Sequence, residues 1–385
     1  MIERLKYLQK VKKALNRSQV TALLGSRQVG KSTLARIITE KFKASYFDLE
    51  DANDLQRIEN PQTTLGNLNG VVVIDEIQRR PELFPFLRIM ADRLPLPAKF
   101  LILGSASPHL VKETSESLAG RIEFVELGAL NIGEVGTDNW RRCWVRGGMP
   151  RSYLADNESD SAAWRDNFIS TFLERDIPQL GYAIPSITMR RFWMMLAHYH
   201  GQKWNAAELG RSLGLNDRTM RGYLDILTGT FVVRQLLPWF ENAGKRQVKS
   251  PKIYLRDSGL LHTLLRLVDE HDITGHPKCG ASWEGFALEQ VMALTGSKDA
   301  YFWSEHGGAE LDLFIHARGK KWGFEFKYSD SPGTRRSMHT AIEVLNLEHL
   351  WIIYPGDKTY PLTDKITAAG LISLPDLLLK NDLAT

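Results

Sequence analysis

The feature that most constrains this chain is the segment of residues 25–33, which reads Gly-Ser-Arg-Gln-Val-Gly-Lys-Ser-Thr. It follows an apolar run (20–24) and precedes a helical pattern (34–38), so it predicts a strand, a glycine-rich loop and a helix. In such a P-loop the backbone N–H groups surround phosphates, the lysine adds a positive charge and the serine hydroxyl reaches magnesium. The residues expected to contact ATP here are Gly25, Arg27, Gln28, Val29, Gly30, Lys31, Ser32 and Thr33.

Composition limits the class of protein. The 385 residues are 43% hydrophobic and 24% charged, and the chain exceeds the usual ~100–200 residues of one domain. No apolar run approaches the ~18 residues of a membrane span, and the first twenty residues suit an amphipathic helix better than a signal peptide. With two cysteines, Cys143 and Cys279, neither a disulfide framework nor a zinc site is supported. We expect a multidomain cytoplasmic protein without a membrane partner.

A second nucleotide motif is Gly-Val-Val-Val-Ile-Asp-Glu-Ile at residues 70–77. Its β-branched run predicts a buried parallel strand that delivers two carboxylates at its carboxyl end. In this Walker B motif, Asp75 is expected to hold magnesium through water and Glu76 to act as general base on the attacking water. One strand between the two motifs and the second acid indicate the ATPase group that includes AAA+ and RecA-like proteins.

Two more positions extend the predicted nucleotide site. Residues 99–105 form an apolar strand that ends at Ser105, where such ATPases place a residue that senses the γ-phosphate. Arg121 closes the segment Ser-Leu-Ala-Gly-Arg before a further strand at residues 122–127. It is a candidate arginine finger for a neighbouring subunit's ATP, and an ordinary surface arginine is the alternative.

Together, the segments GSRQVGKST, VVVIDEIQ, LILGSAS, SLAGR and GGMPRSY resemble a widespread bacterial and archaeal family of AAA-type ATPases with a C-terminal domain of unknown function. The resemblance covers nearly the whole chain. It implies a helical lid after the ATPase core, and it implies that Gly147, Gly148 and Pro150 touch the nucleotide there.

The middle of the chain predicts a helix-turn-helix. Apolar residues in the segment 206–227 have the spacing of two helices joined by a tight turn, with Asn216 or Asp217 as cap of the second. Arg218 and Arg221 then lie on an exposed face that can contact DNA. Strands at 231–237 and 252–255 predict a winged helix with a basic loop, although winged helices also bind proteins. The basic residues of this region are Lys245, Arg246, Lys249, Lys252 and Arg256.

The C-terminal part predicts a helix from residue 282, strands at 300–304, 310–316 and 322–328, a helix at 335–347 and a strand at 350–354. This is the core order of the restriction-endonuclease-like fold. Because side chains alternate along a strand, Glu310 and Asp312 share one face, and Glu325 and Lys327 share another.

The pattern resembles the PD-(D/E)xK nuclease signature, although Leu311-Asp312 stands where Pro-Asp is usual. The resemblance implies that Asp312 and Glu325 bind a divalent metal and that Lys327 positions water and stabilises the phosphate. Glu284 is a further candidate ligand, with Glu289 as its rival. A domain with these residues can also bind without cutting.

The predicted fold class is α/β: a P-loop AAA+ core with a parallel sheet (1–130), a helical lid (131–200), a winged helix (201–262) and a PD-(D/E)xK-like domain (263–385). The predicted function is ATP hydrolysis coupled to action on DNA, with metal-dependent nuclease activity as a further possibility. The expected cofactors are ATP and Mg²⁺, or Mn²⁺ at the C-terminal site. The expected partners are DNA and further copies of the chain, in a ring for example. The alternative is a STAND-like nucleotide-dependent switch whose C-terminal domain binds without cutting.

Overall fold

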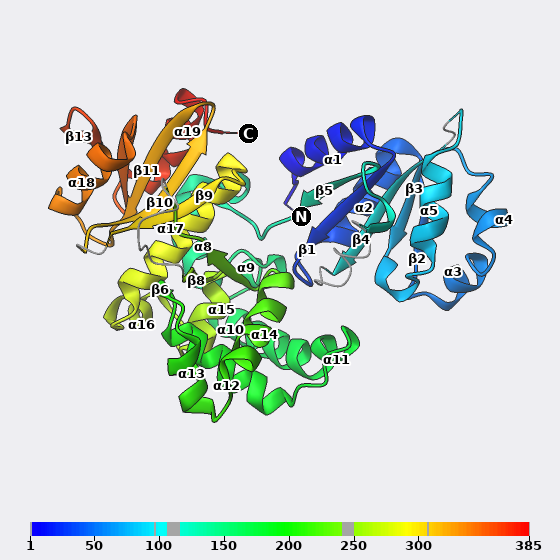
Figure 1. Cartoon of the computed structure of the whole chain (residues 1–385), viewed down its shortest axis with the longest axis horizontal. Coiled ribbons are helices and arrows are strands. Elements are labelled where there is room, and N and C mark those ends of the chain that lie inside the picture. The colour runs from blue at the N-terminus through cyan, green and yellow to red at the C-terminus, as the bar shows by residue number, and fades with distance from the viewer. Residues whose placement is uncertain (1, 96–97, 106–115, 241–249, 306–307, 385) are drawn as a thin grey trace. The chain divides into compact units, whose positions relative to one another are not determined.

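The structure is a computed structural model that describes residues 2–95, 98–105, 116–240, 250–305 and 308–384 (Figure 1). Its internal contacts divide the chain into two compact units. The first comprises Met1–Ala129 with Asp225–Phe231, and the second comprises Leu130–Leu224 with Val232–Thr385. Within the described residues, no helix has both the length and the apolar character needed to cross a membrane.

A five-stranded parallel sheet forms the centre of the first unit, in the order β2-β3-β4-β1-β5. All six residues of β1 are buried, as expected for a central parallel strand covered on both faces. The sheet places β4 between the P-loop strand β1 and the Walker B strand β3, which fits an AAA+ α/β core. The strands are β1 (Val20–Gly25), β2 (Ser45–Asp48), β3 (Gly70–Asp75), β4 (Ala98–Ser105) and β5 (Ile122–Glu126).

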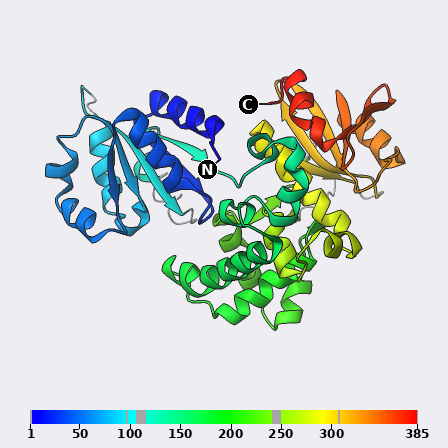
Figure 2. The ribbon, with the colours of Figure 1, turned by 180° about the vertical axis from the view of Figure 1, so that it is seen from behind.

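Helices cover this sheet (Figures 1 and 2). The predicted amphipathic lead-in helix is present, and it buries Tyr7, Val11, Ala14 and Leu15. Alternate residues of β1, β3 and β4 form one core with Phe84 and Leu87 of α5. The helices are α1 (Leu5–Arg17), α2 (Lys31–Phe42), α3 (Ala52–Arg57), α4 (Pro61–Leu65) and α5 (Leu83–Ala91).

The second unit begins with a helical part. It consists of α7 (Ile132–Val135), α8 (Trp140–Arg146), α9 (Pro150–Tyr153), α10 (Glu158–Thr171), α11 (Ile177–Gln179) and α12 (Ser186–His198), with a π-helical turn at Phe172–Asp176. The predicted helix pair follows as α13 (Ala206–Leu213) and α14 (Asp217–Gly229). Asn216, not Asp217, caps α14, because its side-chain oxygen accepts a 2.9 Å hydrogen bond from Thr219 N.

A small antiparallel sheet comes next, in the order β6-β8-β7, with β6 (Gln202–Lys203), β7 (Val233–Leu236) and β8 (Lys252–Leu255). The chain after β7 continues along the C-terminal sheet: Phe302 N donates to Leu237 O at 3.0 Å, and Trp239 N donates to Phe302 O at 2.7 Å. The strands predicted as a wing are therefore joined to the C-terminal domain. Helices α15 (Ser258–Leu264) and α16 (Glu270–Gly275) complete this region.

The C-terminal domain contains a six-stranded mixed sheet in the order β13-β14-β12-β11-β10-β9. Helix α18 packs on β10 and β12, whereas α17 packs on β11 and α19. The predicted helix and strands are α17 (Cys279–Thr295), β9 (Ala300–Ser304), β10 (Glu310–Ala317), β11 (Lys320–Phe326), α18 (Arg336–Leu345) and β12 (His349–Tyr354). The structure adds β13 (Thr359–Thr363), β14 (Ile366–Gly370) and α19 (Leu374–Lys380), which were not predicted.

Candidate functional site

The P-loop connects β1 to α2 and has the backbone shape of an anion site. Gln28 (φ 59°) and Gly30 (φ 100°) adopt left-handed conformations, and α2 begins immediately afterwards at Lys31. Consecutive N–H groups in such turns point into a concavity that attracts phosphate. At Gly25 a Cβ atom would lie 2.4 Å from the carbonyl oxygen of Leu127, so this position requires glycine. The backbone at the start of the P-loop therefore packs directly against the backbone at Leu127.

The predicted contact residues differ in how far they are exposed. Lys31 is 7% exposed, and its Nζ donates to the carbonyl oxygens of Gly25 (3.0 Å) and Ser26 (2.9 Å). Burial lowers the pKa of Lys31 to about 8, although the charges of Glu76 and Asp75 act in the opposite direction. Val29 is fully buried and anchors the loop. Arg27 and Ser32 are partly buried, and Gln28 and Thr33 are exposed.

Arg4, which was not among the residues predicted from the sequence, holds the backbone of the P-loop through hydrogen bonds. This side chain is 6% exposed and donates to the carbonyl oxygens of Val29 (3.3 Å) and Gly128 (3.0 Å). A buried guanidinium is stable only when its N–H groups find such acceptors. Arg4 therefore ties the start of the chain to the loop.

The Walker B carboxylates lie at the carboxyl end of β3, as predicted. Asp75 is 2% exposed, and its two oxygens accept hydrogen bonds from Tyr46 Oη (2.6 Å) and Glu76 N (2.9 Å). Glu76 has a left-handed backbone (φ 54°), which is strained for a non-glycine residue and is often found at functional sites. Its carboxylate accepts a short hydrogen bond from Gln78, and burial raises its pKa. A carboxylate with a raised pKa is better suited to accept a proton from water.

Ser105 and Arg121 lie at opposite ends of the P-loop strand β1. Ser105 ends β4 and pairs in register with Gly25, so its backbone borders the start of the P-loop. Arg121 precedes β5, and its carbonyl accepts from Val20 N at the other end of β1. Its guanidinium forms hydrogen bonds of 2.6 and 2.9 Å with Asp92. Within one chain, Arg121 is therefore at the far end of β1 from the P-loop.

The Gly-Gly-Met-Pro element joins α8 to α9 in the second unit, and the glycine at position 147 has an explanation that needs no nucleotide. The carboxylate of Asp257 accepts from Gly148 N (2.9 Å), Met149 N (3.2 Å) and, at the start of α15, Leu260 N (2.9 Å). A Cβ atom at Gly147, where φ is +77°, would lie 2.1 Å from Asp257 Oδ1. Pro150 occupies the first turn of α9, and its predicted contact with nucleotide stays a prediction.

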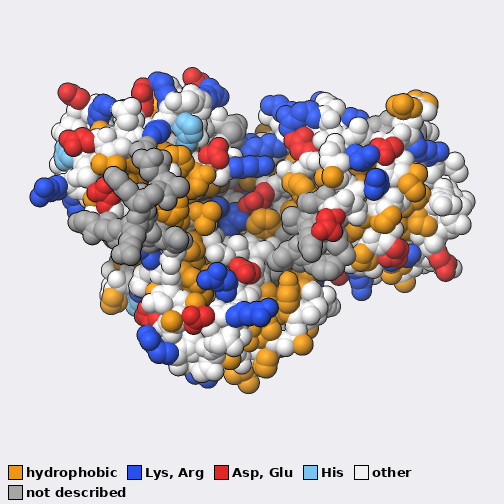
Figure 3. Space-filling view, viewed as in Figure 1, with side chains coloured by type: hydrophobic (Ala, Val, Ile, Leu, Met, Phe, Trp, Pro, Cys, Tyr) orange, Lys and Arg blue, Asp and Glu red, His pale blue; other side chains and the backbone are white. Residues whose placement is uncertain are grey.

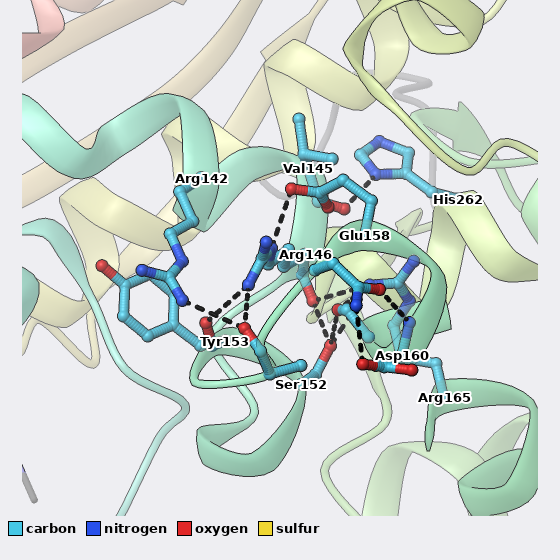
Figure 4. Close-up of polar contacts among 12 residues, drawn as sticks. Arg142, Val145, Arg146, Ser152, Tyr153, Glu158, Asp160, Arg165 and His262 are labelled. Carbon is cyan, nitrogen blue, oxygen red and sulfur yellow. Dashed lines mark hydrogen bonds and ion pairs between the residues drawn. The ribbon is translucent and has the colours of Figure 1, made fainter. Parts of the chain in front are cut away.

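A buried polar network surrounds this element (Figure 4). The guanidinium of Arg165 is fully buried and donates to Ser161 Oγ (2.6 Å) and Thr263 Oγ1 (2.7 Å). Arg146 of α8 pairs with Glu158 of α10 at 2.9 Å. These contacts hold α8, α10 and α15 in one arrangement.

In the C-terminal domain, the structure brings the predicted nuclease residues together. Lys327 Nζ lies 2.7 Å from Glu325 Oε2 and 3.4 Å from Asp312 Oδ2. The backbone N–H of Phe326 also donates to Asp312 at 3.1 Å. Asp312 and Glu325 are 7% and 4% exposed, so this is a buried set of ionisable groups.

Lysines from the small sheet enter the same cluster. Lys252 of β8 lies 2.5 Å from Glu310 Oε1, 3.4 Å from Glu284 Oε1 and 3.4 Å from Asp312 Oδ1. Its register partner on β6, Lys203, lies 2.9 Å from Glu310 Oε2. In the part of the chain that the structure describes, no group of three or more His, Cys, Asp or Glu side chains is placed to hold a metal ion. The predicted ligands Glu284, Asp312 and Glu325 face ammonium groups instead.

The pKa shifts follow these contacts. Burial and the charge of Asp312 raise the pKa of Glu325 to about 8 and that of Glu284 to about 6. Burial disfavours the charged form of Asp312, but Lys252 and Lys327 outweigh it and lower its pKa. Burial likewise opposes the charge of Lys252, yet its acidic neighbours raise its pKa well above the ordinary value. Lys252 is therefore a fixed cation.

Glu289 does not belong to this cluster. It forms a 2.9 Å hydrogen bond with Arg234 Nη2 and lies 3.5 Å from Arg256 Nε. Of the two candidates on α17, it is Glu284 that lies with Asp312. Arg256, like Lys252, was predicted to belong to a basic DNA-facing region, and both side chains are instead directed into ion pairs within the protein. The remaining predicted loop residues, Lys245, Arg246 and Lys249, lie outside the described residues.

The helix pair presents basic side chains to solvent. Arg218 and Arg221 on α14 are exposed, as predicted, and so is Arg211 on α13. Neither Arg218 nor Arg221 makes a hydrogen bond or ion pair with any described residue. On the face shown in Figure 3, lysines and arginines of the helical region lie among acidic side chains. The exposed arginines of α13 and α14 therefore provide positive charge at this site, although the surface shown in Figure 3 carries both signs of charge.

Comparison with known families matches three consecutive segments. The AAA domain family matches residues 17–136, a domain of unknown function (DUF8612) matches residues 137–271, and a second (DUF4143) matches residues 279–374. The AAA match coincides with the P-loop and Walker B geometry. It supports use of a nucleotide, with Mg²⁺ as the usual companion.

Solved structures are similar at a lower level. The Walker-type ATPase paby2304 of Pyrococcus abyssi is 15% identical, with a TM-score of 0.49, and the match covers 69% of this chain and 96% of that one. The STAND protein PH0952 of Pyrococcus horikoshii, which has a tetratricopeptide repeat sensor, is 12% identical, with a TM-score of 0.29, and the match covers 77% of this chain and 46% of that one.

Two curated relatives are much more similar. The uncharacterized proteins Rv2008c of Mycobacterium tuberculosis and Mb2031c of Mycobacterium bovis are each 51% identical over 368 residues, which is 96% of this chain and 83% of each relative. The chain belongs to the same family as these two mycobacterial proteins, and its N-terminal part is an AAA-type P-loop ATPase domain.

Proposed function

We propose that this protein hydrolyses ATP and uses the cycle to change how its second unit engages DNA. The observation that carries the ATPase part is the arrangement of Lys31, Asp75 and Glu76. A buried lysine lies in a loop shaped for phosphate, and its charge interacts with both Walker B carboxylates. The two acids differ in environment, because Asp75 accepts two hydrogen bonds whereas burial raises the pKa of Glu76.

These differences assign different roles. The P-loop amides and Lys31 bind the phosphates, and Ser32 and Asp75 would hold the Mg²⁺, which would neutralise charge developing on them. Glu76 takes a proton from the attacking water, a contribution of typically ~10²–10⁴-fold. Ser105, beside Gly25, senses the γ-phosphate. Arg121 acts on the ATP of a neighbouring copy in a homo-oligomer, since it lies away from the P-loop of its own chain.

DNA contact is proposed for the exposed face of α14 and the basic loop after β7. Arg218 and Arg221 have no partner among the described residues and are three positions apart, close to one helical turn. In DNA-binding proteins, arginine side chains on an exposed helix face contact phosphates or base edges. Lys245, Arg246 and Lys249 add positive charge in the segment that follows β7 in the sequence.

The salt dependence of DNA binding tests this surface. Each phosphate contact contributes about 0.9 to the slope of log K against log salt concentration, so replacing Arg218 and Arg221 by alanine should reduce the slope by up to ~2. Replacing the exposed residues Arg336 and Lys380, on α18 and α19, is the matched control and should leave the slope unchanged. Equal slopes for the wild type and the Arg218/Arg221 variant would assign α14 another role.

Metal-dependent DNA cleavage is a second candidate activity, favoured by the proximity of Asp312, Glu325 and Lys327. The lysines in the cluster favour instead a C-terminal domain that binds without cutting, as in a nucleotide-dependent switch. Linear and branched DNA incubated with Mg²⁺ or Mn²⁺, with and without ATP, distinguishes the two. Cleavage that disappears in Asp312→Ala supports a nuclease, and intact DNA throughout supports the switch.

A further inference from the structure

Lys252 has an unusual position for a lysine. Its side chain is 4% exposed and comes from β8, in the small sheet, yet its ammonium group lies among carboxylates of α17 and β10. Nζ is 2.5 Å from Glu310 Oε1 and 3.4 Å from both Glu284 Oε1 and Asp312 Oδ1. Three carboxylates thus surround one buried nitrogen.

The surroundings match the needs of a cation. An ammonium group has three donors and no acceptor, so three carboxylate oxygens can satisfy it completely. Burial of the carboxylates without a counter-ion would be costly, since uncompensated charges in the protein interior are strongly destabilising. Tyr254, two residues further along β8, donates a 2.5 Å hydrogen bond to Glu284 Oε1 and orients that carboxylate.

The other two lysines of the cluster differ from Lys252. Lys203 is 34% exposed and contacts Glu310, while Lys327 is 25% exposed and contacts Asp312 and Glu325. Lys252 is the most deeply buried of the three, at 4% exposed, and it contacts three carboxylates, whereas Lys203 and Lys327 contact one and two. Its ammonium group contacts Glu284 and Asp312, which were predicted to be ligands of a metal ion.

We propose that Lys252 is a built-in counter-cation that blocks a divalent-cation site formed by Glu284, Glu310 and Asp312. The ammonium offsets part of the carboxylate charge and occupies the space between the three carboxylates, so a metal ion cannot enter. The oxygens are spaced around a nitrogen atom, at distances longer than the ~2.0–2.1 Å of Mg²⁺ coordination. Removal of the ammonium leaves three oxygen ligands, the type that hard divalent cations prefer.

The test uses the full-length protein, with Mn²⁺ as the probe and neither DNA nor ATP present. Its result is therefore independent of both proposed activities. Binding is measured as the loss of the electron paramagnetic resonance signal of free Mn²⁺, and stability as thermal unfolding with and without Mn²⁺. Lys252→Met removes the ammonium while keeping an apolar stem of similar length. Lys203→Met is the matched control, because it removes a more exposed lysine from the same cluster.

The proposal predicts that Lys252→Met binds Mn²⁺ at the cluster about tenfold or more tightly than the wild type, and that Mn²⁺ raises the unfolding temperature of this variant alone. Addition of Asp312→Asn to Lys252→Met should abolish the gain, and Lys203→Met should behave like the wild type. A Lys252→Met protein that folds only with Mn²⁺ supports the same conclusion.

Three results would overturn the proposal. The first is Asp312-dependent Mn²⁺ binding by the wild type with the affinity of the variant. The second is a folded Lys252→Met protein that gains no Mn²⁺ binding. The third is a Lys252→Met protein that fails to fold with or without Mn²⁺, because the metal then cannot replace the ammonium.

Discussion

The ammonium group of Lys31 donates a 2.9 Å hydrogen bond to the carbonyl oxygen of Ser26, within its own loop. Lys31 is thus held in place by the loop that it serves. We expect Lys31→Ala to lose nucleotide binding, because the phosphates lose the buried ammonium group of the P-loop. Binding of a fluorescent ATP analogue measures this. Lys41→Ala, at the exposed end of α2, is the control, and equal affinity in both variants would remove Lys31 from the site.

Gly147 provides a test of the loop between α8 and α9. Gly147→Ala combines a left-handed backbone with a Cβ atom 2.1 Å from Asp257 Oδ1. We expect destabilisation of about 1–3 kcal/mol from the backbone alone, and more when Asp257 releases the N–H groups of Gly148 and Met149. Thermal unfolding measures the change.

Gly222→Ala is the matched control, since it lies within helix α14 and a Cβ atom there meets nothing within 4 Å. Alanine is favoured over glycine in a helix, so this change should stabilise by about 0.5–1 kcal/mol. Similar unfolding temperatures for the two alanine variants would contradict the packing described for Gly147.

The nucleotide motifs could be predicted because their information is local. The turn residues Gln28 and Gly30, the lysine and the start of α2 lie within a few positions, and Asp75 and Glu76 directly end their strand. The parallel sheet was predicted, but the order of its strands was not, because strand order depends on pairing between segments far apart in the sequence. Helix α14 and its exposed arginines were also predicted from local spacing.

Long-range pairs could not be predicted in this way. Asp257 binds the amides of Gly148 and Met149 from more than a hundred positions away, and Lys252 meets Asp312 across 60 positions. Lys252 was predicted to face solvent because residues 241–256 are rich in positive charge. The number of charges in a segment does not show which side chains point into the protein. Strand β13 was missed since Pro361 and its polar residues give a weak strand signal. Strand β14 was missed since its alanines and glycine have low strand propensity.

The raised pKa of Glu325 predicts a pH dependence of stability. Burial and Asp312 raise this pKa from 4.5 to about 8, so between these values the folded protein retains a proton that the unfolded chain has lost. Stability from this residue is therefore complete below pH 4.5 and falls as the pH rises toward about 8. Glu325→Gln cannot lose a proton, so its stability relative to the wild type should increase across this range.

Urea unfolding at several pH values measures the difference between the two proteins. Glu343→Gln, on the exposed side of α18, is the control and should differ from the wild type by a constant amount. Parallel pH curves for the wild type and Glu325→Gln would show that Glu325 is ionised in the folded protein throughout.

The most direct test of the account is the steady-state rate of ATP hydrolysis with and without duplex DNA. We predict that the wild type hydrolyses ATP and that DNA increases the rate. We predict that Glu76→Gln binds ATP with normal affinity but hydrolyses it about 10²-fold or more slowly, because only the attacking water needs the carboxylate. The Arg218/Arg221 double alanine variant should keep the basal rate and lose the stimulation. A wild-type rate that is indifferent to DNA, or a Glu76→Gln rate equal to that of the wild type, would contradict the account.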